Sequence, residues 1–223
     1  MLSEAIHSDY RIHSIVFREG VSAPENLDLP LENCFTANKI DFQRLSSQVS
    51  PEGILVVLHI PNEDFFAQVK VPEFELKGPA FILAGIQDPG NLGTIIRTSD
   101  WFGMKTLICG PGTTDCFNPK VLRSSMGSLF RLQIVYISDL EEWLQLNSKD
   151  VWCADMDGSP LDQVDLPSKP FVLLGNEAAG VSEAIRSIEG LQKVTIPRYG
   201  KAESLNAASA ATVFAWNMRP HQN

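Results

Sequence analysis

From Pro79 onward, short apolar runs alternate with amphipathic segments, and this alternation constrains the fold more than any other feature. The runs "AFILAGI", "KTLICG", "RLQIVYI", "VWCADM", "PFVLLG" and "QKVTIP" predict strands, and the segments between them predict helices. Strands and helices that alternate over this length form a mostly parallel sheet with helices on both faces. We therefore predict an α/β domain over residues 80–223.

Local signals predict several helix ends in this domain. Gly103 is a stop signal for "TIIRTSDWFG", Asp139 is a cap for "DLEEWLQLN", and Ser182 is a cap for "EAIRSI". The preceding stretch "QDPGNLG" is read as a turn, with Asn91 at the cap of the helix that follows. The last helix follows residues 204–206 and consists largely of alanine and apolar side chains.

The first 72 residues predict a smaller α/β unit, joined to the larger domain by a linker over residues 73–79. "RIHSIVF" predicts a strand, and "DFQRLSSQ" predicts a helix capped by Asp41. "GILVVLHI" is almost continuously apolar, which predicts a strand buried on both faces.

Charge and cysteine usage exclude several classes of protein. A net charge of −9 argues against a protein that coats nucleic acid non-specifically, although a local basic patch can still bind RNA. The four cysteines lack the spacing of zinc or redox motifs, so we expect reduced thiols, no metal site and a cytoplasmic location. No apolar run is long enough to predict a signal peptide or a membrane span.

Three loops at the predicted carboxyl ends of the strands are rich in glycine and polar side chains, and ligands bind at this edge of such sheets. They are residues 87–93, 175–180 and 197–206. The glycines of the first loop do not form a dinucleotide fingerprint, and no phosphate-loop lysine follows them. A nicotinamide-dependent oxidoreductase or a nucleotide triphosphatase is therefore disfavoured.

Each polar residue also has a simple structural explanation. Arg97 can pair with Asp100, and Glu177 can compensate a helix dipole. One of Ser204 and Asn206 caps the last helix, which leaves the other beside a ligand-sized gap. Gly175 allows the backbone to approach a ligand closely.

Taken together, the loops resemble the three motifs of the SpoU (TrmH-like) family of ribose methyltransferases in the SPOUT superfamily. The matching stretches are "DPGNLGTIIRTSDWFG", "LLGNEAAGVS" and "IPRYGKAESLNAASAA", in the family's order and spacing. The intermediate "FNPKVLRSSMGSLFRLQIV" is similar to a further family segment. The resemblance covers residues 80–218.

The resemblance implies a C-terminal trefoil knot that binds S-adenosylmethionine. It also implies that the knotted domain forms a homodimer, commonly with the last helix at the interface. The N-terminal unit is similar, more loosely, to a ribosomal-protein-like domain that helps hold RNA, which favours ribosomal RNA over tRNA. Because the chain begins only a few residues before this unit's first helix, we allow for a natural N-terminal extension. The cofactor-binding residues implied by the match are Leu174, Gly175, Ile196, Pro197 and Leu205.

The implied reaction is methyl transfer to a ribose 2′-oxygen. Arg97 matches the family arginine held to remove the hydroxyl proton, although a free guanidinium is a poor base. The polar residues expected around it are Asn91, Glu177, Ser204 and Asn206. Arg198 departs from the apolar residue usual at its position. The alternatives for this side chain are a simply exposed position and a contact for RNA, and because Lys201 shares its loop we favour the contact. The alternatives are a tRNA methyltransferase and a cofactor- and RNA-binding protein without turnover.

Overall fold

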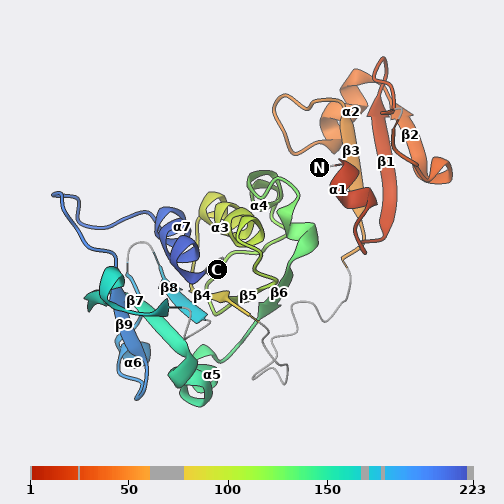
Figure 1. Ribbon diagram of the computed structural model, residues 1–223. Coiled ribbons are helices and arrows are strands. Elements are labelled where there is room, and N and C mark those ends of the chain that lie inside the picture. Colours follow the sequence, from red (N-terminus) through yellow and green to blue (C-terminus); the bar gives the residue numbers. More distant parts are fainter. Residues whose placement is uncertain (1, 25, 61–77, 167–170, 177–178, 220–223) are drawn as a thin grey trace. The chain divides into compact units, whose positions relative to one another are not determined.

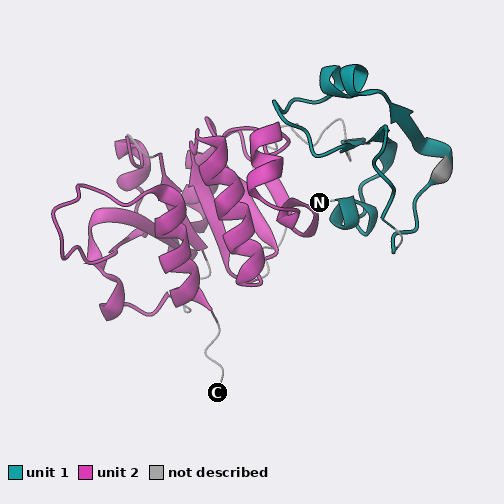
Figure 2. Ribbon diagram, turned by 90° about the horizontal axis from the view of Figure 1, so that it is seen from above, with its two compact units in different colours: residues 1–65 teal, residues 66–223 magenta. Residues whose placement is uncertain are grey.

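The computed structural model describes the chain except for residues 1, 25, 61–77, 167–170, 177–178 and 220–223. The chain divides into two compact units, Met1–Phe65 and Phe66–Asn223 (Figure 2). Most of the predicted linker, residues 73–77, lies outside the described residues.

The N-terminal unit is a three-stranded sheet with the order β2-β1-β3. Strand β2 is parallel to β1, whereas β3 is antiparallel to it. The elements are α1 (Leu2–Ile6), β1 (Ile12–Arg18), the 3₁₀ helix η1 (Leu31–Asn33), β2 (Cys34–Ala37), α2 (Lys39–Leu45) and β3 (Ile54–Leu58). The prediction that β3 is buried on both faces is wrong, because β3 is an edge strand and Val57 is 41% exposed.

The cap of α2 is Asn38, and the prediction of Asp41 is wrong. The Asn38 Oδ1 atom accepts hydrogen bonds from the backbone N–H groups of Ile40 and Asp41. The Asn38 side-chain amide donates to the Asp41 carboxylate at 2.7 Å. Asp41 therefore lies inside the first turn, where its negative charge also favours the helix N-terminus.

The C-terminal unit contains a six-stranded sheet with the order β6-β5-β4-β8-β7-β9, and every pairing between its described strands is parallel. This confirms the predicted α/β class. The strands are β4 (Ala80–Ala84), β5 (Thr106–Cys109), β6 (Gln133–Tyr136), β7 (Val151–Pro160), β8 (Phe171–Gly175) and β9 (Gln192–Thr195).

Helices cover both faces of this sheet (Figure 1). Helices α3, α4 and α7 share one face, and α5 and α6 lie on the other. The helices are α3 (Pro89–Trp101), α4 (Pro119–Ser124), η3 (Ser128–Arg131), α5 (Leu140–Asn147), η4 (Ser148–Asp150), η5 (Leu161–Gln163), α6 (Glu183–Arg186) and α7 (Ala207–Met218). The caps predicted at Asp139 and Ser182 are confirmed, and Gly103 follows α3 with a φ of 76°.

Helix α3 begins earlier than predicted. Its cap is Asp88, whose carboxylate accepts a hydrogen bond from the backbone N–H of Asn91 at 2.9 Å. Pro89 occupies the first turn, where its fixed φ and missing N–H are favourable. Asn91 is therefore inside the first turn, which corrects its assignment as the cap.

The core of this unit is closely packed and apolar. A cluster between the sheet and α5–α6 includes Ile82, Ile108, Leu173 and Trp143, each at most 3% exposed. All four cysteines are free thiols, as predicted, and Cys109, Cys116 and Cys153 are buried. Among the described residues, no helix combines the length and apolar character that a membrane span requires.

Candidate active site

A cavity of about 1060 Å³ lies beside the middle of β7 and the ends of β8 and β9, and the start of α7 borders it. Loops at the carboxyl ends of parallel strands commonly form ligand sites, because the strands place several loops at one edge. The five residues expected to bind cofactor all line this cavity: Leu174, Gly175, Ile196, Pro197 and Leu205. Ser204 lines it as well.

A charged wall completes the cavity. Asp155 and Asp157, which belong to β7, pair with Arg186 at the end of α6, at N–O distances of 2.7 and 2.9 Å. The negative charge of Asp155 raises the pKa of the Arg186 guanidinium above its usual value. The sequence analysis did not predict Arg186 at this site. No local pattern links that arginine to carboxylates about thirty positions earlier in the chain.

Gly175 is closely packed against the chain that follows it. A Cβ atom at this position would lie 2.4 Å from the carbonyl carbon of Gly180 and 2.6 Å from the nitrogen of Val181. The absence of a side chain at Gly175 is therefore required by the protein's own packing, and the expected close approach of a ligand remains a prediction. Gly175 allows Gly180 and Val181 to lie against the end of β8, where Asn176 and Gly180 exchange backbone hydrogen bonds.

Asn206 has two functions. Its Oδ1 atom caps α7 by accepting hydrogen bonds from the backbone N–H groups of Ala208 and Ser209. Its side-chain nitrogen donates to Oδ1 of Asn91 at 2.9 Å. This bond joins the start of α7 to the first turn of α3, 115 positions apart in sequence. Asn206 is therefore the residue that caps α7, and Ser204 is the one of the two that does not.

The start of α3 is held in place by α4. The Lys120 ammonium lies 3.1 Å from the Asp88 carboxylate, and the Ser124 hydroxyl donates to the Pro89 carbonyl at 3.3 Å. The hydrogen bond from the Asn91 backbone and then the bond from Lys120 lower the pKa of Asp88. The cap of α3 therefore stays ionised at neutral pH, beside the pair of asparagines.

Arg97 lies two turns further along α3 and is exposed. It does not line the cavity, and no described carboxylate forms an ion pair with it. The suggested pairing with Asp100 is wrong, because Asp100 binds Arg131 at 2.7 Å. Glu177 lies outside the described residues. The structure thus links Asn91 to Asn206, places Ser204 at the cavity and leaves Arg97 on the adjoining surface.

Comparisons with known proteins show the family to which the chain belongs. Residues 79–216 match the model of the SpoU rRNA Methylase family. The chain is 31% identical over 222 residues to the 23S rRNA (guanosine(2553)-2'-O)-methyltransferase RlmP of Bacillus subtilis, covering 98% of this chain and 85% of that protein. It is also 32% identical over 176 residues to a 23S rRNA (uridine(2479)-2'-O)-methyltransferase of Streptomyces viridochromogenes, covering 75% of this chain and 60% of that protein.

Among solved structures, the SpoU methyltransferase AviRb from Streptomyces viridochromogenes in complex with AdoMet is similar, with a TM-score of 0.78. It is 27% identical, and the match covers 97% of this chain and 85% of that one. The family model spans well over half of the sequence, and RlmP is similar over nearly all of it. The chain belongs to the SpoU rRNA methylase family.

Proposed function

We propose that this protein transfers a methyl group from S-adenosylmethionine to a ribose 2′-hydroxyl of RNA, with ribosomal RNA as its substrate. The observation that carries the proposal is the bond between Asn91 and Asn206, which joins two family motifs beside the cavity. The relatives named as 23S rRNA 2′-O-methyltransferases support the choice of ribosomal RNA. The N-terminal unit is proposed to hold that RNA.

The chemistry of the cavity suits the cofactor. Apolar side chains, among them Val194, Ile196 and Leu205, offer walls for an adenosine group. Carboxylates and guanidinium groups both line the cavity, which suits a ligand that carries an ammonium and a carboxylate. When bound, S-adenosylmethionine supplies an electrophilic methyl group. The residues proposed to hold it are Leu174, Gly175, Ile196, Pro197 and Leu205.

The chain's own residues are proposed to orient the ribose 2′-hydroxyl. Asn91 and Asn206 fix each other's amide groups, so their remaining hydrogen-bonding atoms have a set direction. Ser204 is at the cavity wall and Arg97 is on the next surface, where a guanidinium can bind an RNA phosphate. Arg97 is proposed to act at the reacting ribose, together with Glu177, Ser204 and the two asparagines.

The proposal includes a knotted C-terminal domain that forms a homodimer. Trp101 at the end of α3 is 84% exposed, and Trp216 on the neighbouring α7 is 56% exposed. These helices contact each other through Thr98 and Thr212 and through the rings of Phe102 and Trp216. Exposed aromatic side chains on adjacent helices are typical of protein interfaces.

Trp101→Glu is expected to convert the dimer to a monomer, because it would bury two unpaired carboxylates across a symmetric interface. Sedimentation velocity measures the change in mass. Leu146→Glu is the matched control, since Leu146 is 71% exposed but lies on α5, on the other face of the sheet. Equal masses for both variants and the unaltered protein would contradict the proposed interface.

The function is tested in two steps. Calorimetry with S-adenosylhomocysteine measures cofactor binding, and a labelled methyl group then reports transfer to ribosomal RNA or to tRNA. We expect binding and transfer to a ribose of ribosomal RNA. Transfer to tRNA alone would favour the tRNA alternative, and binding without transfer to either RNA would favour a protein without turnover.

A further inference from the structure

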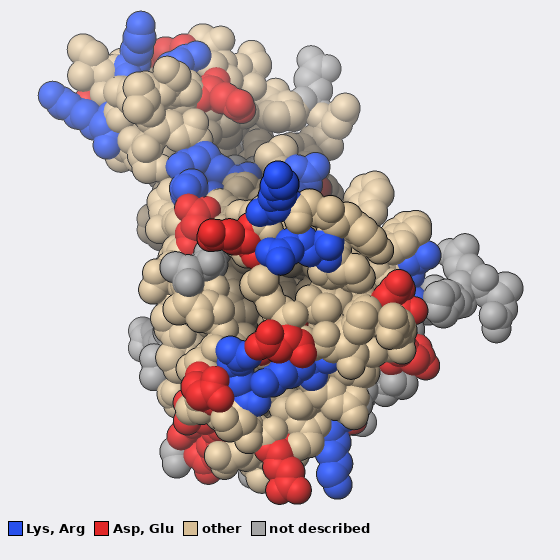
Figure 3. Space-filling view, turned by 90° about the vertical axis from the view of Figure 1, so that its left-hand side faces the viewer, with Lys and Arg blue, Asp and Glu red and all other residues tan. Residues whose placement is uncertain are grey.

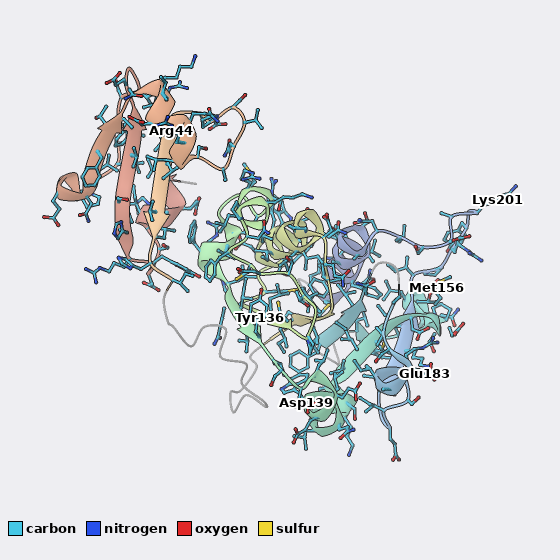
Figure 4. All side chains as sticks on the ribbon, turned by 180° about the vertical axis from the view of Figure 1, so that it is seen from behind. Arg44, Tyr136, Asp139, Met156, Glu183 and Lys201 are labelled. Carbon is cyan, nitrogen blue, oxygen red and sulfur yellow. The ribbon has the colours of Figure 1, made fainter. Side chains whose placement is uncertain are left out.

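The loop between β9 and α7 exposes a tyrosine between two cations. Tyr199 is 93% exposed, and Arg198 and Lys201 are also exposed. The loop extends away from the sheet before the chain returns to α7 (Figure 1). Lys201 lies at its outer end and points away from the other elements (Figure 4). The side chains at this tip therefore contribute little to the core.

The loop is nevertheless part of the site. Arg198 and Tyr199 both line the cavity, as do Gly200 and Ala202. The Arg198 guanidinium donates to the carbonyl of Ala202 at 3.4 Å, which closes the loop into a turn. An aromatic ring and the Arg198 guanidinium thus line the cavity in which we place the cofactor, and Lys201 lies in the same loop at its outer end.

This combination suits unpaired RNA. A base that is not stacked in a helix offers an aromatic face, and stacking on a protein ring is the common means of holding it. The neighbouring cations attract the phosphates on either side. The whole chain carries a charge of −9, so two cations beside one exposed ring are not explained by its overall composition. Lys and Arg side chains gather in groups on this side of the molecule, with Asp and Glu beside them (Figure 3).

We propose that Tyr199 stacks on an unpaired base next to the methylated nucleotide, with Arg198 and Lys201 bound to its phosphates. This inference rests on the proposed function, because it assigns a structural class to that RNA substrate. A base can stack on Tyr199 only if its face is accessible. The RNA substrate is therefore a single-stranded loop or bulge and not a continuous duplex, in which the base faces are already stacked. The acidic neighbours Glu203 and Asp157 restrict the favourable path of the phosphates to the Arg198–Lys201 side.

The test measures binding of a fluorescein-labelled oligouridylate of about 12 nucleotides, a length within the usual range of single-strand sites. A duplex of the same length is measured in parallel. Tyr199→Ala is expected to weaken single-strand binding about tenfold, which is the size of one lost stacking contact. Tyr199→Phe keeps the ring and is expected to bind like the unaltered protein. The affinity for S-adenosylhomocysteine is measured in the same variants, so that an effect on the cavity is recorded separately from an effect on RNA binding.

The charge contribution is measured separately through salt dependence. Lys201→Ala is expected to reduce the slope of log affinity against log salt by about 0.7, the value for one phosphate contact on a single strand. Lys149→Ala is the matched control. Lys149 is equally an exposed lysine, but it precedes β7 and so lies at the opposite edge of the sheet. Its loss is expected to leave the slope unchanged.

The outcomes separate this inference from the proposed function. If the unaltered protein binds no S-adenosylhomocysteine, the function fails, whatever Tyr199 does. If the cofactor binds while Tyr199→Ala leaves oligouridylate affinity and RNA turnover intact, the stacking inference is overturned. An equal loss of duplex and single-strand binding, or a loss of the dimer in Tyr199→Ala, also overturns it, since the loop would then serve another partner.

Discussion

Asn206→Ala is expected to lower kcat for methyl transfer about 100-fold or more, the usual effect of losing one precisely oriented polar group at a reacting centre. The variant is also expected to destabilise the protein by about 1–2 kcal/mol, because α7 loses its cap. The decrease in kcat follows from the loss of the hydrogen bond that the Asn206 side-chain amide donates to Asn91. Single-turnover transfer to ribosomal RNA and urea unfolding measure the two effects separately.

Two further variants separate capping from the link to Asn91. Asn206→Ser keeps an oxygen for the cap but is too short to replace the amide donor, so stability should recover while turnover stays low. Asn38→Ala removes a similar cap from α2 in the N-terminal unit, and it should cost stability without lowering kcat. Full turnover in Asn206→Ser would show that the bond between the asparagines is dispensable.

The sequence was sufficient to predict the class of fold. Each strand of the C-terminal unit is an apolar run between turn signals, and the pattern is local. The order of the strands is not local, because it depends on which edges pair in space. Similarly, the continuous apolar run of β3 did not show that it would lie at an edge of a small sheet. The short strand β2 has no run of its own and was not predicted.

The two incorrect caps have a common cause. At Asp88–Asn91 and at Asn38–Asp41, two possible caps lie three positions apart, and the sequence analysis predicts the second of each pair. The first residue of each pair has extended backbone angles, whereas the second is already in the helix. Pro89 indicates that Asp88 is the cap of α3, because proline is favoured in the first turn of a helix. Asn38 had no equivalent marker.

The site was predicted through family motifs rather than through distances. Asn91 and Asn206 come from different ends of the C-terminal unit, and only the packing of α7 on α3 brings them together. The resemblance could name both residues but not their hydrogen bond. Asp155 and Arg186 belong to no recognised motif, so the charged wall emerged only from the structure.

Gly175→Ala is expected to impair both folding and cofactor binding. The new methyl group would meet the backbone of Gly180 and Val181 at 2.4–2.6 Å, and backbone cannot rotate away as a side chain does. Overpacking of this kind costs about 1–3 kcal/mol of stability. The loop that lines the cavity must move, so affinity for S-adenosylhomocysteine should fall about tenfold or more, equivalent to about 1.4 kcal/mol. Urea unfolding and calorimetry measure the two quantities.

Gly200→Ala is the matched control, because Gly200 lines the same cavity and a Cβ atom there would meet nothing within 4 Å. Its φ is also outside the left-handed region, so alanine fits its backbone. We expect unchanged stability and unchanged cofactor affinity. If Gly175→Ala binds cofactor as well as Gly200→Ala does, the fold of the 175–180 loop does not determine the shape of the site. The cofactor would then be held chiefly by the loop that precedes α7.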